Sequence, residues 1–579
     1  MRFLVLSATF VVFAFSSDGA LAADSNGYTA QYECRAGGPS CNVDVTAFAA
    51  QSCNTTITTA DSAATIDSKL NGANTAICVE SGDYTGTGAW RVTKSGTSAT
   101  RRVLRYYRAG DNGGDPWTPN FNQAKIPQLV VDAANFWVVH RLTVNANDSQ
   151  IKGLSVTASS NNIFNRMLVE HAGDANVLIE GGNNNTVQNS VVRYVTLIPG
   201  ADNDCVQVGG GTNNVVVNNE IYDCSSKGIY TWANGWADGT VIENNDVYVS
   251  QNRFSDCNGN PTPSDPNAPC AAFETGIGTK AASTNINNPY RIIHNRVWGG
   301  RLTDTSLCCS SGTEGQMVSI SDGVGDGNGT STSDYVLVKD NIVSQGQIAF
   351  QHPRTGPHRN SFIGNIVYNL QRYTSGLTTI ALDLGGGDAE EIYLNTVVNV
   401  PNYYMSIGQT NGDVRCNVFI DAGTQDGSAN GSQTQINNNA FYNSAKYTAN
   451  DTDNNTSVSL KTRASSTPYA IGDFLRVGAA NSCQSASDSA CFIYRVTKAG
   501  TSAGSSPNYC TSLGCTTSDG SLALQAIRGP YVYRRKLRTV MGGEVQVIPY
   551  ARAHASAPEA YACPSNYASR AGIGISDTP

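Results

Sequence analysis

An asparagine recurs through the middle of the chain, and each time an apolar residue follows it two positions later. Most of the steps between these asparagines are 22 to 30 residues long. The positions are Asn165, Asn189, Asn219, Asn245, Asn295, Asn341, Asn365, Asn395, Asn417 and Asn439. A period of this size is typical of a solenoid, because one repeat is too small to bury its apolar face without its neighbours.

The stretches between the asparagines indicate strands. They are short runs of alternating Val, Ile, Tyr and Thr, separated by Gly, Asn, Asp and Ser, and no amphipathic segment is long enough for a helical repeat. About two dozen residues make one turn of a parallel β-helix, in which stacked asparagine amides hydrogen-bond along the axis. Asparagine also fills ordinary turns, but the constant phase favours a ladder. We predict an all-β, right-handed parallel β-helix.

The two ends of the chain break this pattern. Arg2, an apolar run from Phe3 to Phe15 and the tripeptide Ala20-Leu21-Ala22 indicate a secretory signal peptide that is too short to span a membrane. We predict a signal peptide (1–22), an N-terminal cap (23–70), the β-helix (71–463), a small β module (464–530), and a C-terminal strand and tail (531–579). The module resembles those of carbohydrate-active and phage-tail proteins, without their usual tryptophans.

Composition agrees with export. Sixteen cysteines fit an oxidising compartment, and Cys205 and Cys224 fall on successive coils. Only 15% of residues are charged and the formal charge is −8, which argues against a nucleic-acid binder. No later stretch is long and apolar enough to span a membrane. We expect a secreted monomer whose partner is an extracellular acidic polysaccharide, attracted by local cations.

A second register lies between the asparagines. Apolar residues at i and i+2 point into the coil, so the residues at i+1 and i+3 point outward. We align the inward pairs as Val206/Val208, Ile229/Thr231, Ile277/Thr279, Val318/Ile320, Ile348/Phe350 and Ile380/Leu382. The outward wall then carries Gln207, Tyr230, Trp232, Lys280, Gln351 and Asp383. Such a wall suits a sugar chain lying along it.

The longest insertions flank Lys280. The ladder stretches to 50 residues between Asn245 and Asn295 and to 46 between Asn295 and Asn341, and inserted loops are where sites are usually built. The segments FETGIGTKAAS (273–283) and NPYRIIHNRVWGGR (288–301) resemble the lysine-bearing coil of β-helix polysaccharide lyases, most nearly the pectate lyases of family 9 and the alginate and chondroitin lyases of family 6. In those families a lysine removes the C5 proton of a uronate.

This resemblance implies roles for the residues of the wall. β-Elimination needs a base at C5 and cations that neutralise the adjacent carboxylate. Lys280 is the candidate base, Arg301 and Arg354 are candidate carboxylate clamps, His352 is an alternative base or acid, and Tyr230 is a candidate acid. The candidate substrate-binding residues are Trp232, Gln207, Gln351 and Asp322. Asp202, Asp204 and Glu274 are candidate ligands of a Ca²⁺ ion.

Other interpretations stay open. Lys280 also suits a solvated strand position, the arginines suit loop bracing, and the aspartates suit turns. A glycoside hydrolase needs paired carboxylates, and Asp322 and Asp383 lie two coils apart, roughly 10 Å. A non-catalytic adhesin or tail-like binder is the third class. The sequence therefore predicts a polysaccharide-acting β-helix, with a lyase as the leading function.

Overall fold

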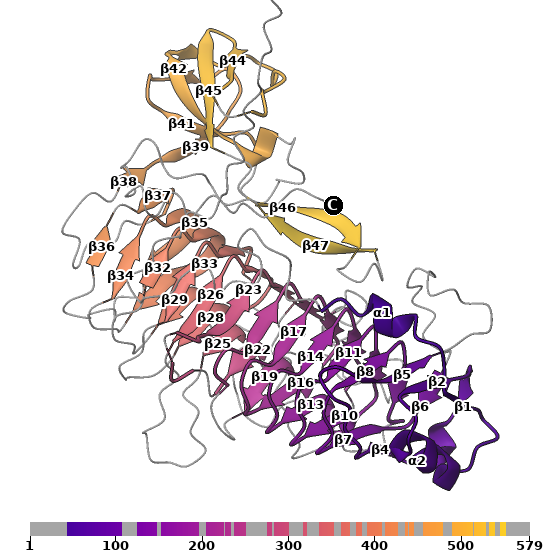
Figure 1. The fold of residues 1–579 in the computed structure, drawn as a ribbon. Helices are drawn as coiled ribbons and strands as arrows, with labels where there is room; N and C mark the ends of the chain where they lie inside the picture. The colour runs from indigo at the N-terminus through magenta and orange to yellow at the C-terminus, as the bar shows by residue number, and fades with distance from the viewer. Residues whose placement is uncertain are drawn as a thin grey trace, which may run out of the picture.

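The computed structural model is a long solenoid with a small domain at its C-terminal end (Figure 1). It describes residues 43–106, 124–147, 152–195, 204–224, 226–232, 237–249, 275–280, 283–285, 287–299, 316–320, 335–352, 360–370, 378–384, 391–407, 412–425, 435–437, 439–444, 456–478, 489–512, 514–528, 532–538 and 545–551. The right-handed parallel β-helix predicted from the sequence is confirmed, since strands of successive coils pair in parallel and in register.

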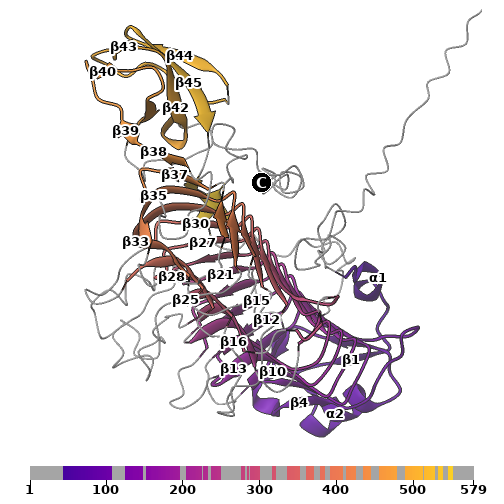
Figure 2. The ribbon, with the colours of Figure 1, turned by 90° about the vertical axis from the view of Figure 1, so that its left-hand side faces the viewer.

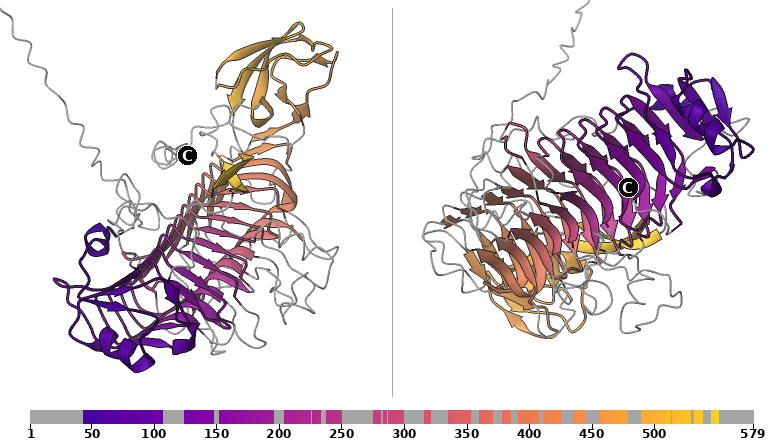
Figure 3. Two further views of the ribbon diagram at one scale, coloured as in Figure 1. Left: turned by 90° about the vertical axis from the view of Figure 1, so that its right-hand side faces the viewer. Right: turned by 90° about the horizontal axis from the view of Figure 1, so that it is seen from below.

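Each complete coil contributes one strand to each of three faces, and Figure 3 shows the strands of successive coils stacked along the solenoid. Face 1 is a 14-stranded sheet. Its strands are β1 (Thr55–Ile57), β2 (Ala76–Val79), β5 (Arg102–Tyr106), β8 (Trp137–His140), β11 (Ile163–Asn165), β14 (Thr186–Gln188), β17 (Val215–Val217), β20 (Val241–Glu243), β23 (Tyr290–Ile293), β26 (Val336–Lys339), β29 (Ser361–Ile363), β32 (Glu391–Tyr393), β34 (Asp413–Arg415) and β36 (Gln435–Asn437).

Faces 2 and 3 join into one 24-stranded sheet, because β33 (Thr396–Ile407) bends through both. The other strands of face 2 are β4 (Trp90–Val92), β7 (Leu129–Asp132), β10 (Lys152–Thr157), β13 (Ala175–Glu180), β16 (Asp204–Gly209), β19 (Lys227–Trp232), β22 (Thr275–Thr279), β25 (Gln316–Ile320), β28 (Ile348–His352) and β31 (Ile380–Leu384). Those of face 3 are β3 (Gly82–Asp83), β6 (Ala124–Ile126), β9 (Thr143–Asn145), β12 (Leu168–Glu170), β15 (Val191–Arg193), β18 (Glu220–Tyr222), β21 (Asp246–Tyr248), β24 (Arg296–Trp298), β27 (Ile342–Ser344), β30 (Ile366–Tyr368), β35 (Val418–Gln425), β37 (Ala440–Tyr442) and β38 (Thr456–Val458).

The N-terminal end of the solenoid is covered by the short helix α2 (Ala63–Asn71), with η2 (Thr85–Thr87) in the first coils, while α1 (Thr46–Ala49) packs on the outer side of face 1 (Figure 2). Ser62 caps α2 by accepting a hydrogen bond from the Thr65 amide at 3.2 Å. Ile66 and Leu70 of α2 pack into the core that runs through the coils. This cap protects the first coil, whose open edge would otherwise pair with other chains. No described helix has the length and apolarity needed to cross a membrane.

The interior is held together by a ladder of buried asparagines that follows face 1. Each side-chain oxygen accepts from the backbone and side-chain amides of the previous rung, and each side-chain amide also donates to a backbone carbonyl. The rungs are Asn219, Asn245, Asn295, Asn341, Asn365, Asn395, Asn417 and Asn439. All of them are fully buried, so these bonds satisfy groups that water cannot reach.

The first two predicted rungs, Asn165 and Asn189, are wrong. In their coils the ladder positions are held by Met167, whose amide donates to the Ser190 hydroxyl, and by Ser190, whose amide donates to Asn219 Oδ1. Asn165 lies at the end of β11 and hydrogen-bonds His140. A second ladder, absent from our sequence analysis, runs through Asn162, Asn185 and Asn214. The Asn-x-apolar pattern does not fix whether the asparagine itself or a residue one or two positions later takes the ladder position. Hydrogen bonding with the neighbouring coils determines which residue takes it.

The residue before each rung from Asn219 to Asn417 turns the chain from face 1 to face 3. It adopts a left-handed conformation, with φ of 51° at Asn244, 56° at His294 and 52° at Asp340. His294 Nδ1 lies 3.7 Å from Glu243 Oε1, and its Nε2 lies 3.5 Å from Asp340 Oδ2. Burial alone would lower the pKa of His294, but the two carboxylates outweigh it and raise the pKa to about 9. At neutral pH His294 is therefore protonated where it lies between Glu243 and Asp340.

His294→Asn is expected to destabilise the protein by about 2–3 kcal/mol near neutral pH and below, because the raised pKa stabilises the folded state in its protonated form. This contribution is fully present below the unfolded pKa of about 6.5 and is lost as pH rises through about 9. Thermal melts of both proteins across this range should converge at the alkaline end. The matched control is His171→Asn, at another left-handed position. An equal pH dependence in the two variants would contradict the assignment.

The C-terminal module packs around its own core. Its strands are β39 (Leu460–Thr462), β41 (Phe474–Arg476), β42 (Ile493–Lys498), β45 (Leu522–Arg528) and β44 (Thr516–Asp519), with the pair β40 (Pro468–Tyr469) and β43 (Gly500–Thr501), and the helical turn η3 (Ser489–Cys491). Tyr469, Phe492, Tyr494 and Tyr509 are buried in that core. These aromatic rings therefore stabilise the module and are not a sugar-binding platform.

The last strands return to the solenoid. β46 (Val532–Arg538) and β47 (Val545–Ala551) form an antiparallel hairpin (Figure 1). β47 packs against β24 and β27 of face 3. The predicted C-terminal strand is thus one half of a hairpin that contacts the middle of the β-helix.

Candidate active site

The predicted wall is the outer side of face 2, where β16, β19 and β22 lie side by side. Val206 pairs with Ile229 and then Ile277, and all three side chains are fully buried in the coil. Gln207 pairs with Tyr230, and Tyr230 pairs with Gly278. Because neighbouring residues of a strand point to opposite sides, Gln207 and Tyr230 lie on the outer side.

Lys280 follows β22 and lies beside Tyr230. Its amide donates to the Thr231 carbonyl at 2.9 Å, and its Nζ is 5.7 Å from the centre of the Tyr230 ring. A Cβ added at Gly278 would lie 3.0 Å from Cδ2 of Tyr230, so the ring covers the strand at the glycine. Tyr230 is only 4% exposed, whereas Lys280 is partly exposed. The structure thus brings together the predicted base and the predicted acid.

A second lysine contacts the same ring. Lys227 Nζ lies 4.5 Å from the centre of Tyr230 and 3.6 Å from Asp204 Oδ1. The side chain of Lys227 is 9% exposed and that of Asp204 is fully buried. Lys227 was not among the predicted site residues, because it precedes the inward pair Ile229/Thr231 and falls in neither outward column. The available signal was opposite charge at the first residue of two successive strands, which parallel pairing places side by side.

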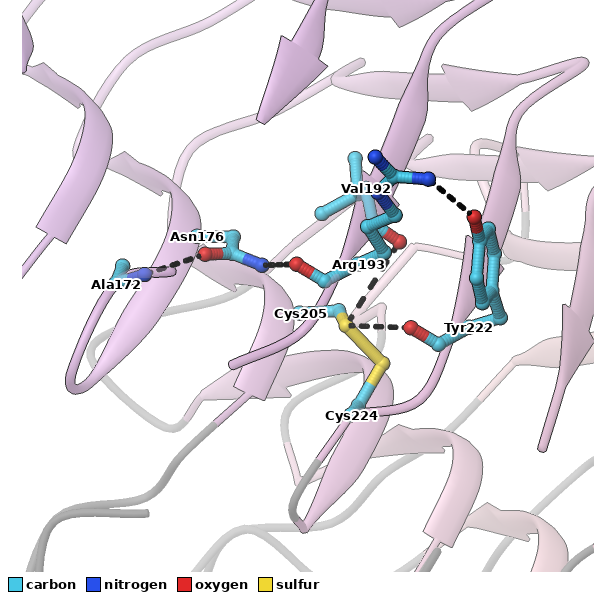
Figure 4. Close-up of a disulfide and its surroundings, with 7 residues drawn as sticks. All are labelled: Ala172, Asn176, Val192, Arg193, Cys205, Tyr222 and Cys224. Atoms are coloured by element: carbon cyan, nitrogen blue, oxygen red, sulfur yellow. Dashed lines mark hydrogen bonds between the residues drawn. A yellow bond between two sulfur atoms is a disulfide. The ribbon is translucent and has the colours of Figure 1, made fainter. Parts of the chain in front are cut away.

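A disulfide fixes the strand ends that carry this ion pair. Cys205, next to Asp204, is bonded to Cys224, three residues before Lys227 (Figure 4). In the same view, Asn176 accepts from the Ala172 amide and donates to the Arg193 carbonyl. A crosslink across 19 residues stabilises the folded state by about 3 kcal/mol through chain entropy. The disulfide therefore links the start of β16, next to Asp204, to the segment that leads into β19 and Lys227.

The predicted alignment fails between β25 and β28, where Val318 pairs with Phe350 and not with Ile348. The predicted alignment of β28 with β31 is confirmed, since Ile348 pairs with Ile380 and Phe350 with Leu382. The apolar pair in β28 is therefore two residues later than predicted, because Ile348 and Phe350 alternate equally well in either register. Gln351 consequently pairs with Ser319 and lies in the same column as Tyr230, not in the column of Lys280.

The shifted register also changes His352. It pairs with Leu384 and its side chain is fully buried. A ring on the inward side cannot meet a substrate on the wall, so the structure contradicts His352 as an alternative base or acid. Gln351 Nε2 donates to Asp383 Oδ2 at 3.3 Å, which places these two residues on adjacent coils of the outer side.

Most of the other predicted site residues lie in segments that the structure does not describe. Trp232 pairs through its backbone with Gly209 at the end of β19. Arg301, Arg354, Asp322, Asp202 and Glu274 lie outside the described residues. Within the described residues, no group of three or more His, Cys, Asp or Glu side chains is placed to hold a metal ion.

Solved structures with a similar fold share little sequence with this chain. AlyGC, a PL6 family alginate lyase, is 12% identical, with a TM-score of 0.44; the match covers 70% of this chain and 54% of AlyGC. The pectate lyase Pel9A is 14% identical, with coverages of 57% and 80% and a TM-score of 0.35. PfbA, a surface adhesin of Streptococcus pneumoniae, is 12% identical, with coverages of 66% and 86% and a TM-score of 0.39. The chain thus spans about half the length of AlyGC. No family model and no curated protein matches the sequence.

Proposed function

We propose that the protein is a secreted polysaccharide lyase that cleaves a uronate-containing polysaccharide by β-elimination on the outer side of face 2. The observation that supports this best is the position of the Lys280 amine beside the phenol of Tyr230, on adjacent coils of one wall. Neighbouring coils are about 4.8 Å apart, so both groups reach one sugar linkage. The disulfides fit the oxidising destination that the proposed signal peptide implies.

The proposed reaction uses these two groups in turn. The amine of Lys280 takes the C5 proton, the electron pair of the C5–H bond forms the C4–C5 double bond, and the C4–O bond breaks. The Tyr230 hydroxyl gives its proton to the departing oxygen. Arg301 and Arg354 remain the proposed clamps for the uronate carboxylate. We propose that the enzyme acts as a monomer on an extracellular acidic polymer.

The test is to incubate the mature protein with pectate, alginate, glucuronan and glycosaminoglycans and to follow the ultraviolet absorbance of the unsaturated uronate. We expect a rise with at least one polymer. Release of reducing ends without this absorbance would overturn the lyase in favour of a hydrolase that uses Asp322 and Asp383. Binding without either product would favour an adhesin-like protein.

A further inference from the structure

The wall next to the proposed base contains a buried ion pair. The carboxylate of Asp204 has no exposed surface, and Lys227 Nζ is 3.6 Å from it. A carboxylate buried without a cation is strongly unfavourable, so the structure requires a positive charge at this point. The question is whether a metal ion or a side chain supplies it.

The described residues do not fit calcium here. Ca²⁺ takes six to eight oxygen ligands at about 2.3–2.6 Å, and the ammonium of Lys227 faces the one candidate ligand that is described. The next residue along the same column is Thr275, which pairs with Lys227 and carries no charge. An ammonium within contact distance of Asp204 would repel a divalent ion bound to that carboxylate. The calcium predicted with Asp204 is therefore not supported at this position.

The ammonium group of Lys227 also lies over the ring of Tyr230, the proposed acid. Lys227 Nζ lies 4.5 Å from the centre of the Tyr230 ring, and Lys280 Nζ contacts this ring at 5.7 Å. Tyr230 is thus held by a cation–π contact whose lysine is fixed by Asp204. Because Lys227 is almost fully buried, it acts on a bound sugar through its field and through Tyr230, in a site where water does not screen it.

We propose that Lys227 is the built-in cation of this site: a positioning residue that takes the place of a calcium ion, so that the site works without calcium. This inference rests on the proposed lyase function for its activity readout only. The positive charge favours the anionic carboxylate of a uronate and orients the Tyr230 hydroxyl toward the leaving oxygen.

The first test needs no activity. The melting temperature of the wild-type protein should be the same in chelator and in excess calcium. Lys227→Glu places a second carboxylate beside Asp204 and should gain a calcium-dependent rise in melting temperature. A calcium-dependent rise in the wild type that disappears in Asp204→Asn would overturn the proposal, because Asp204 would then be a metal ligand.

The second test measures turnover in chelator. The double variant Lys227→Met/Asp204→Asn removes both charges of the pair and should fold, with kcat lowered roughly 10²-fold and KM little changed. Lys227→Arg should retain most of kcat. The matched control is Lys152→Met, at the same register position of β10. Unchanged kcat in the double variant, or activity that requires calcium, would overturn the proposal. A wild-type protein without lyase activity would refute the proposed function, while the calcium test would still decide the role of Lys227.

Discussion

Lys280→Met is expected to lower kcat by about 10²–10⁴-fold, because it removes the group that takes the C5 proton. Lys280 directly follows β22 and is partly exposed, so the change should leave the melting temperature close to that of the wild type. The measurement is the initial rate on whichever polymer the wild-type protein cleaves, together with a thermal melt of each protein.

Lys152→Met is the control for this experiment also, since Lys152 lies on the same face and is likewise partly exposed. Its rate should equal that of the wild type. Wild-type activity in Lys280→Met would show that another group is the base and would remove the main support for the proposed mechanism.

Asn341→Leu is expected to lower the free energy of unfolding by about 3–5 kcal/mol. The asparagine accepts from the amide and side chain of Asn295 at 2.9 and 3.1 Å, and it donates to the Ile292 carbonyl and Asn365 Oδ1 at 2.8 and 3.0 Å. Leucine removes all four bonds and leaves several buried polar groups without partners, each costing about 1–3 kcal/mol. Chemical denaturation of the two proteins measures the difference.

The control for the ladder is Asn399→Ala. Asn399 donates to Asn369 on the neighbouring coil at 2.7 Å, but it is only partly buried, so water can replace that bond. Its substitution should cost less than about 1.5 kcal/mol. Equal losses in the two variants would mean that the buried ladder contributes no more than an ordinary surface contact.

The fold was predictable because every coil of a stacked architecture needs the same kinds of residue at the same positions, so the pattern recurs along the sequence. From Asn219 onward the buried amides fall where the period places them, since each rung needs its neighbour to be satisfied. The phase was not predictable in the first coils, where Met167 and Ser190 hold the ladder positions. Hydrophobic alternation alone cannot distinguish two registers that differ by two residues, which is why β28 was misaligned.

The site was predictable only in part, for a different reason. Lys280 and Tyr230 follow from strand alternation within one coil and from pairing with the next. Lys227 is the first residue of β19, before the apolar pair of that strand. The inward–outward alternation within β19 does not reveal which residue of a neighbouring coil its side chain contacts. Its role depends on Asp204 in the coil below, so it appears only when the two coils are stacked.

The contact of β47 with β24 and β27 changes how the solenoid should unfold. In a simple stack every coil touches only the coils beside it, so either end can fray without disturbing the middle. Here β47 contacts a central coil, the one in which β22 leads to Lys280. Separation of the last coils from the rest then requires the hairpin to detach as well. Fraying of the C-terminal coils and opening of the middle of the solenoid are therefore coupled in a single event, and the coil that carries Lys280 gains its full set of contacts only after β47 has folded onto it.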